Sequence, residues 1–205
     1  MTRFHSYDPA QGHRLPHDPL NAIVAPRPIG WISTLSADGV RNLAPYSFFN
    51  LMSDHPPLLA FSSSGWKDSV ANAQATGAFV WNLATRAQAE AMNATSAGAA
   101  SGVDEFTLAG LDTIDPVAVA PPRVAGSPVQ FECRVTQILR LSDMADDDTD
   151  QWLVVGQAVA IHIDEALLED GIYQTARARP ISRGGGPADY FETTPDALFR
   201  MRRPG

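Results

Sequence analysis

Apolar residues recur at every second position in the third quarter of the chain. The alternation runs through residues 129–136 and returns in 153–163. Because successive side chains of a β-strand point to opposite faces, the pattern predicts two long antiparallel strands, each with one buried and one solvent-exposed face. The apolar positions are Val129, Phe131, Cys133, Val135, Leu153, Val155, Val159, Ile161 and Ile163, and the polar positions of the first strand are Gln130, Glu132, Arg134 and Thr136.

A second pair of strands is predicted on either side of Asp38-Gly39. This dipeptide supplies the positive φ angles of a tight hairpin turn, and runs rich in β-branched and aromatic residues flank it within 26–50. Pro45 cannot donate a hydrogen bond to a neighbouring strand. We therefore expect regular pairing to stop near Ala44-Pro45 and to leave backbone polar groups free.

The intervening stretch alternates short strands and short helices. Strands are predicted over 58–62 and 79–83. One helix is predicted from about Asp68 to Thr76 with Gly77 as its C-terminal stop, and another over 86–94. A run of small residues, 96–102, follows and is expected to be flexible or tightly packed.

The composition limits which classes of protein and partner are possible. The 205 residues with 44% hydrophobic content suit one domain, 1–205, with an N-terminal arm (1–20) and a C-terminal tail (190–205). The net charge of −8 argues against nucleic acid or an anionic membrane as partner. The sequence has no apolar run long enough to span a membrane and no signal-peptide core, which predicts a cytoplasmic protein. The single cysteine, Cys133, is interpreted as a buried thiol.

No metal site is predicted. His13 and His17 have helical spacing, but Gly12 and Pro16 disfavour a helix there. The acidic run 143–150 lacks the glycine and the final glutamate of a calcium-binding loop, so we interpret it as a solvated hairpin loop.

Two neighbouring stretches carry candidate chemistry. Tyr46, Ser47 and Phe48 offer stacking surfaces and hydrogen bonds to a flat heteroaromatic ring, although aromatic strands are more often core. The run 62–69 brings hydroxyls and a helix start to Lys67, the only lysine among fifteen basic residues, which is how proteins commonly hold a phosphate. A ring site and a phosphate site so close in sequence predict a nucleotide-like cofactor.

Three blocks of the sequence resemble the flavin reductase-like FMN-binding split-barrel family, which includes flavoredoxins and reductase components of two-component monooxygenases. The blocks are 27–34, 42–50 and 67–69, and the likeness extends from about His17 to Tyr190. It implies a mainly β (α+β) fold, an antiparallel Greek-key barrel with short flanking helices, which dimerises with FMN at the subunit interface. The implied cofactor-binding residues are Trp31, Ile32, Ser33, Thr34, Ala44, Tyr46, Ser47, Phe48, Ser62, Ser63, Ser64, Lys67, Asp68, Ser69 and Phe106.

The resemblance implies specific roles for three residues of this set and a specific property of one loop. Thr34 and Ser47 would bond the ribityl chain or the ring of FMN. Phe106 would lie near the partner subunit's flavin, or it is simply a core phenylalanine. In the closing loop, Arg183-Gly184-Gly185-Gly186, a glycine replaces the family's leucine and one glycine is extra, so we expect a looser loop.

The absence of a catalytic triad or paired carboxylates suits an enzyme whose cofactor carries the chemistry. The resemblance implies an NAD(P)H-dependent flavin reductase, with NADH or NADPH as donor, which passes electrons to a flavin or to a partner oxygenase. One alternative is a flavoredoxin-like FMN electron carrier with a protein redox partner. Another is a barrel that binds no flavin.

Overall fold

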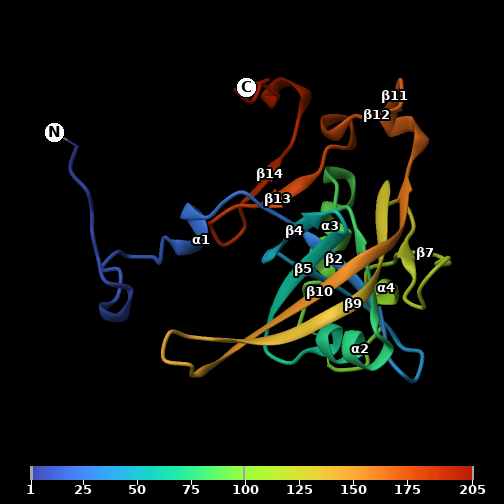
Figure 1. Cartoon of the computed structure of the whole chain (residues 1–205), viewed down its shortest axis with the longest axis horizontal. Helices are drawn as coiled ribbons and strands as arrows, with labels where there is room; N and C mark the ends of the chain where they lie inside the picture. The colour runs from blue at the N-terminus through green and yellow to red at the C-terminus, as the bar shows by residue number, and fades with distance from the viewer. Residues whose placement is uncertain (1, 99, 205) are drawn as a thin grey trace.

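The computed structural model describes residues 2–98 and 100–204. Met1 of the predicted arm, Ala99 of the small-residue run and Gly205 of the predicted tail lie outside the described residues. Short helices flank a body made mostly of antiparallel strands (Figure 1). The helices are α1 (Leu20–Ile23), α2 (Asp68–Thr76), α3 (Ala89–Ala94) and α4 (Glu105–Leu108), with 3-10 turns η1 (Pro9–Gln11), η2 (Arg86–Gln88), η3 (Glu165–Leu167), η4 (Thr175–Ala178) and η5 (Pro195–Ala197).

The main sheet has seven strands in the order β3-β2-β6-β9-β10-β5-β4, with antiparallel pairing throughout. These strands are β2 (Gly30–Leu35), β3 (Arg41–Tyr46), β4 (Phe49–Asp54), β5 (Pro57–Ser64), β6 (Ala78–Asn82), β9 (Val129–Ser142) and β10 (Asp148–Ile163). Smaller sheets pair β1 (Arg27–Pro28) with β13 (Ile181–Arg183) and β14 (Tyr190–Glu192), β7 (Thr113–Ile114) with β8 (Arg123–Val124), and β11 (Leu168–Glu169) with β12 (Ile172–Tyr173).

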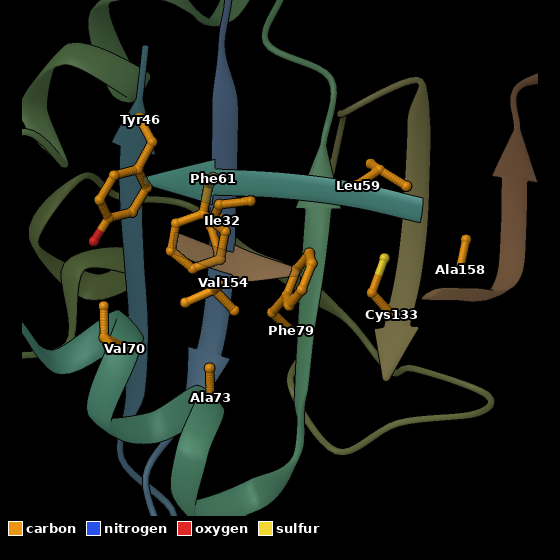
Figure 2. Close-up of a cluster of buried hydrophobic side chains, with 10 residues drawn as sticks. All are labelled: Ile32, Tyr46, Leu59, Phe61, Val70, Ala73, Phe79, Cys133, Val154 and Ala158. Carbon is orange, nitrogen blue, oxygen red and sulfur yellow. The ribbon is translucent and has the colours of Figure 1, made fainter. Parts of the chain in front are cut away.

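The main sheet curls until its two ends meet. Tyr46 on the edge strand β3 and Phe61 on β5 have ring centroids 4.8 Å apart, although four strands separate β3 from β5 in the sheet. Phe61 in turn meets Phe79 edge to face at 5.4 Å. These rings lie in the buried cluster inside the curled sheet, and helix α2 closes one end of it (Figure 2). The cluster comprises Ile32, Tyr46, Leu59, Phe61, Val70, Ala73, Phe79, Cys133, Val154 and Ala158.

A second buried cluster lies on the opposite face of β2 and β3. It contains Trp31 and Leu43 from these strands, Met92 from α3 and Phe106 from α4. Neighbours in a strand therefore belong to different cores, since Ile32 packs in the first cluster and Trp31 in the second.

Several local predictions are confirmed. Gly39 has φ +83° in the turn between β2 and β3, and α2 begins at Asp68 and ends at Gly77, which adopts the left-handed conformation. Cys133 is wholly buried, and burial raises the pKa of its thiol. None of the described helices is long and apolar enough to cross a membrane.

The predicted interruption of pairing at Pro45 is wrong. Pairing with β2 continues past Pro45, which stands opposite Trp31, and β3 ends at Tyr46. Leu43, two residues earlier, turns its N–H away from β2 to a carboxylate of Glu105. Residues two apart direct their N–H groups to the same side, so Pro45 occupies an outward position where no ladder bond is lost.

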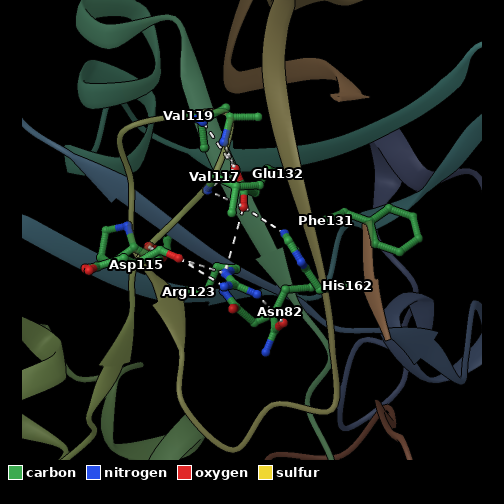
Figure 3. A network of polar contacts seen from close by, with 12 residues as sticks. Asn82, Asp115, Val117, Val119, Arg123, Phe131, Glu132 and His162 are labelled. Carbon is green, nitrogen blue, oxygen red and sulfur yellow. Dashed lines mark hydrogen bonds and ion pairs between the residues drawn. The ribbon is translucent and has the colours of Figure 1, made fainter. Parts of the chain in front are cut away.

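The predicted solvent-exposed face of the first long strand is wrong at two positions, Gln130 and Glu132, which are 4% and 0% exposed. The segment 115–124 covers this part of the sheet, and the N–H groups of Val117, Ala118 and Val119 all donate to the Glu132 carboxylate (Figure 3). Arg134 and Thr136, beyond this cover, are exposed as predicted.

On β10 the apolar alternation does not mark the buried face. The inward residues are Val154, Gly156 and Ala158, whereas Val159, Ile161 and Ile163 are 41%, 48% and 39% exposed. Gly156 has an evident packing reason, because a Cβ there would lie 2.4 Å from the Phe79 ring. The outer side of the sheet is thus apolar in a single chain.

The terminal segments meet beside the barrel. The N-terminal arm extends away from the body and buries no residue up to Asp18 (Figure 1). The closing loop is not loose: a Cβ on Gly185 would lie 2.0 Å from the Cα of Ala22 in α1. Arg27 donates to the carbonyl oxygens of Asn21 and Val24 and lies 3.5 Å from that of Gly184, so it joins both segments to β1.

Candidate functional site

A pocket of about 380 Å³ opens between β3, the first turn of α2 and the chain after α3. Five residues of the predicted cofactor set meet there, and other segments add hydroxyl and carboxylate groups. The lining residues are Asn42, Ala44, Pro45, Tyr46, Lys67, Asp68, Ser69, Thr95, Ser96, Ala97, Gly98, Ser101 and Glu105. We call it the α2 pocket.

The alternation of β3 explains which of its residues reach the α2 pocket. Asn42, Ala44 and Tyr46 are two residues apart and line the pocket together. Thr34 on β2 stands opposite Asn42 in the strand register, and it is completely buried beneath it.

Four buried polar side chains form the floor of the α2 pocket. The Nδ2 group of Asn42 donates to Oγ1 of Thr34 at 3.0 Å and to Oγ of Ser69 at 2.9 Å. Asn72 also donates to Oγ1 of Thr34, at 3.2 Å. These bonds join β2, β3 and α2, so the floor is fixed by residues far apart in sequence. Since buried polar groups are costly unless they are bonded, the arrangement holds each side chain in one orientation.

Tyr46 extends this floor towards β5. Burial raises the pKa of its hydroxyl, while hydroxyl groups of Ser69 and Ser63 oppose the rise. Tyr46 is therefore a neutral hydrogen-bonding group at neutral pH, with its ring against Phe61.

Lys67 and Asp68 lie where α2 begins. Lys67 is the N-cap residue, its side chain is exposed, and no ion pair of Lys67 is found among the described residues. Asp68 accepts a hydrogen bond from Oγ of Ser101 at 2.7 Å and one from the N–H of Gly102 at 3.0 Å. The Asp68 carboxylate thus holds the chain after α3 beside the pocket, which is a different use from surrounding a phosphate.

Glu105 brings a second carboxylate to the α2 pocket. Its Oε2 accepts from the N–H of Leu43 at 3.0 Å. Burial, together with the nearby charges of Asp68 and Asp104, raises the pKa of Glu105, although the Leu43 N–H opposes this. The next carboxylate, Asp104, caps α4 and pairs with Arg41, which fixes Glu105 in place.

Ser47, Phe48 and Ser62 line a neighbouring pocket of about 660 Å³ instead, which we call the α1 pocket. The two pockets adjoin along the chain, because Tyr46 lines the α2 pocket and the next residue, Ser47, lines the α1 pocket. Phe48 is 48% exposed, with the guanidinium of Arg27 5.8 Å from its ring centre.

Two predicted hydroxyl residues are engaged with other parts of the protein. Ser63 donates to the carbonyl oxygen of Gly65 at 3.0 Å, and Ser64 accepts from Gln151 at 2.8 Å. Neither lines the α2 or the α1 pocket. Their role in holding a phosphate stays a prediction.

Three further predicted residues do not line the α2 pocket. Trp31 donates from Nε1 to Thr95 Oγ1 at 3.0 Å, and Ser33 donates to the carbonyl oxygen of Pro122 at 2.6 Å, both from the opposite face of β2. The ring of Phe106 is wholly buried in the second cluster, which is the core arrangement left open by the sequence. Ile32 shares the face of Thr34 but is core as well.

Asn42, Thr95 and Glu105 were not predicted as site residues. The position of Asn42 could have been predicted from the sequence, because it lies two residues before Ala44 and four before Tyr46 and so shares their face of β3. No sequence pattern predicts the position of Glu105, because its hydrogen-bond partner Leu43 lies 62 residues away in the chain.

Comparison with known proteins identifies the family. The model of the flavin reductase like domain matches residues 24–182. An uncharacterized protein of Aquifex aeolicus is 36% identical over 170 residues, which are 80% of this chain and 83% of the relative.

Solved structures agree with this assignment. Nitrilotriacetate monooxygenase component B from Bacillus cereus has a TM-score of 0.86 and 28% identity, covering 99% of this chain and 100% of that one. A protein with a split barrel domain from Shewanella frigidimarina has a TM-score of 0.79 and covers 90% of both chains, and at 20% identity it shows the fold alone. The predicted split-barrel fold is confirmed, and the chain belongs to the flavin reductase-like family.

Proposed function

We propose that the protein binds FMN and works as an NAD(P)H-dependent oxidoreductase. The observation that carries the proposal is the α2 pocket, where the only lysine and the start of a nine-residue helix face a buried polar floor. Family membership supports the same conclusion.

The phosphate end of FMN fits the start of α2. The first N–H groups of a helix have no partner within the helix, and they favour an anion. Lys67 adds a mobile cation with no competing ion pair among the described residues. Asp68 is already bonded to Ser101 and Gly102, so its charge is directed to the neighbouring loop.

The ring end of FMN fits the junction of the two pockets. Tyr46 and Ser47 stand there, and Ser47 lies beyond the last paired residue of β3. Its N–H is available to the edge of a flat ring, and Phe48 supplies an apolar surface. When bound, FMN would supply hydride and electron transfer, while these residues bind it, orient it and limit its contact with water.

The electron donor we propose is NADH or NADPH, and the acceptor is a free flavin or a partner oxygenase. The partner oxygenase is proposed as acceptor because of the similarity to a monooxygenase component B. Mixing FMN-loaded protein anaerobically with each nucleotide tests the proposal. We expect rapid bleaching of flavin absorbance by at least one of them.

A flavoredoxin-like electron carrier is the alternative, suggested by the same resemblance. It predicts that FMN is bleached by a reduced protein donor and that neither nucleotide bleaches it. A protein that remains colourless after incubation with FMN would contradict both proposals.

We also propose a homodimer. The outer side of β10 exposes Val159, Ile161 and Ile163, and β4 exposes Leu51 and Met52. Apolar surface of this kind commonly marks a subunit interface. Light scattering should give twice the 22.0 kDa chain mass, and Ile161→Asp should shift the particle to the monomer mass. A wild-type monomer with FMN bound would contradict the proposal.

A further inference from the structure

We propose that the C-terminal tail of one copy of the chain, 198–204, binds the tip of the β9–β10 hairpin, 139–150, of a second copy. The inference does not depend on bound FMN. It adds a specific contact to the proposed homodimer, and it assigns an occupant to a part of the main sheet whose side chains are exposed in a single chain.

The β9–β10 hairpin extends beyond the rest of the main sheet. β6 pairs with β9 no further than Arg134, and β5 pairs with β10 no further than Gln151. Among the described residues, the two strands pair only with each other near the tip, as a ribbon that projects from the barrel (Figure 1). A two-stranded ribbon is marginally stable in water, and packing against a further element stabilises it.

The hairpin tip presents apolar and acidic side chains together. Leu139, Leu141 and Met144 are exposed, and Met144 is wholly exposed. Five aspartates lie within 143–150, and only one of them forms an ion pair in the part of the chain that the structure describes. A partner that covers this tip must therefore supply apolar surface and positive charge.

The C-terminal tail has the complementary composition. Leu198, Phe199 and Met201 are exposed, so the tail offers apolar surface. Three arginines stand within 200–203, and residues 2–98 and 100–204 provide no ion pair for their side chains. The segment 198–204 contains no acidic residue, although the whole chain has a net charge of −8. Charge complementarity thus selects the tail as the occupant of the hairpin tip.

The contact joins two copies rather than two parts of one chain. The tail follows β14, where the N–H of Thr193 donates to the carbonyl oxygen of Pro180 at 2.9 Å. Figure 1 shows the C-terminus and the hairpin tip at separate ends of the molecule. Two such contacts related by a two-fold axis would close a dimer, because each subunit gives a tail and receives one.

Cysteines placed in both segments test the contact, because the one native cysteine, Cys133, is wholly buried. In the double variant Met144→Cys/Met201→Cys, oxidation with copper–phenanthroline should link two chains into a species of twice the 22.0 kDa chain mass on a non-reducing gel. Each single variant should give about tenfold less of this product, because only bound segments hold two thiols at a high effective concentration. Salt at about 1 M, where the Debye length is about 3 Å, should lower the yield.

A matched control moves the second cysteine from the tail to the other end of the chain. Phe4 and Met201 are 81% and 82% exposed, and each lies within a few residues of a terminus. Met144→Cys/Phe4→Cys should therefore give no more linked dimer than the single variants.

Charge reversal tests why the segments bind. In the Met144→Cys/Met201→Cys protein, Arg200→Glu/Arg202→Glu should abolish the link, because the tail would then repel the acidic tip. Adding Asp147→Lys/Asp150→Lys should restore it. Circular dichroism checks that each variant is folded.

The outcomes separate this contact from the proposed homodimer. Equal linking through Phe4, linking that survives the reversal of Arg200 and Arg202, or a reversal that the lysines do not rescue would each overturn the inference. A disulfide formed within one chain, which leaves the mass at 22.0 kDa, would overturn it as well. A wild-type monomer in light scattering would contradict the homodimer and this contact together, whereas a dimer without the link would contradict this contact alone.

Discussion

Gly185 packs against Ala22 so closely that a Cβ on the glycine would lie 2.0 Å from the alanine Cα. The loop after β13 and helix α1 therefore touch through backbone atoms. We predict that Gly185→Ala separates them at a cost of about 1–3 kcal/mol in the free energy of unfolding, the range for overpacking. Urea denaturation measures this cost, and chymotrypsin should cleave faster after Leu20. Gly98→Ala is the control, because a Cβ there meets no atom within 4 Å. Equal effects in both variants would contradict the prediction.

Lys67→Gln should weaken FMN binding selectively. The change keeps a similar length and removes the charge, and a charge-assisted contact with the phosphate contributes roughly 1.5–3 kcal/mol, so affinity should fall by about ten- to a hundredfold. Riboflavin lacks the phosphate and should bind as it does to the wild type. Flavin fluorescence titration gives both constants. If FMN and riboflavin lose affinity equally, Lys67 supports the ring or the fold, and if neither does, it is a solvated surface residue.

Ser47→Pro should abolish flavin binding in a folded protein. Proline removes the backbone N–H that we assign to the edge of the ring. Because β3 ends at Tyr46, the change leaves the β2–β3 pairing intact. Ser47→Ala keeps the N–H and should retain the flavin. Absorbance of the purified variants, with circular dichroism for folding, checks this, and a yellow Ser47→Pro protein would refute the assignment.

Glu132 should make stability depend on pH below the neutral range. Burial acts to raise the pKa of this carboxyl, but the N–H groups of Val117 and Ala118, His162 and the N–H of Val119 outweigh it, so the pKa lies below its ordinary value of 4.5. The folded state therefore holds the proton less tightly than the unfolded state. The stabilisation is complete above the unfolded pKa and is lost as pH falls through the lowered one.

Glu132→Gln tests this relationship. It should lower the free energy of unfolding at pH 7 by about 1–3 kcal/mol, because one oxygen that accepted N–H groups becomes a donor. It should also flatten the loss of stability below pH 4.5. Urea denaturation from pH 3 to 7 measures both effects. Glu90→Gln on the exposed surface of α3 is the control. A wild-type slope in Glu132→Gln would show that other carboxyls set the acid sensitivity.

Signals confined to a few neighbouring residues were sufficient for the local elements. Asp38-Gly39 specifies a turn because glycine adopts positive φ at little cost, and Gly77 ends α2 for the same reason. The family blocks then specified the split barrel. The alternation of side chains along a strand also places Asn42 on the same face as Ala44 and Tyr46, and it places Thr34 and Ser33 on opposite faces.

Only the tertiary structure decided which faces are buried and which remote groups complete the α2 pocket. The sequence of β9 gives no sign that Glu132 is buried, because the N–H groups that offset the cost of burying its charge come from 117–119. Glu105 likewise reaches Leu43 only after α4 packs on β3. A period-two pattern in the sequence indicates that a strand has two different faces. Which of the two faces is buried depends on the segments that pack against it.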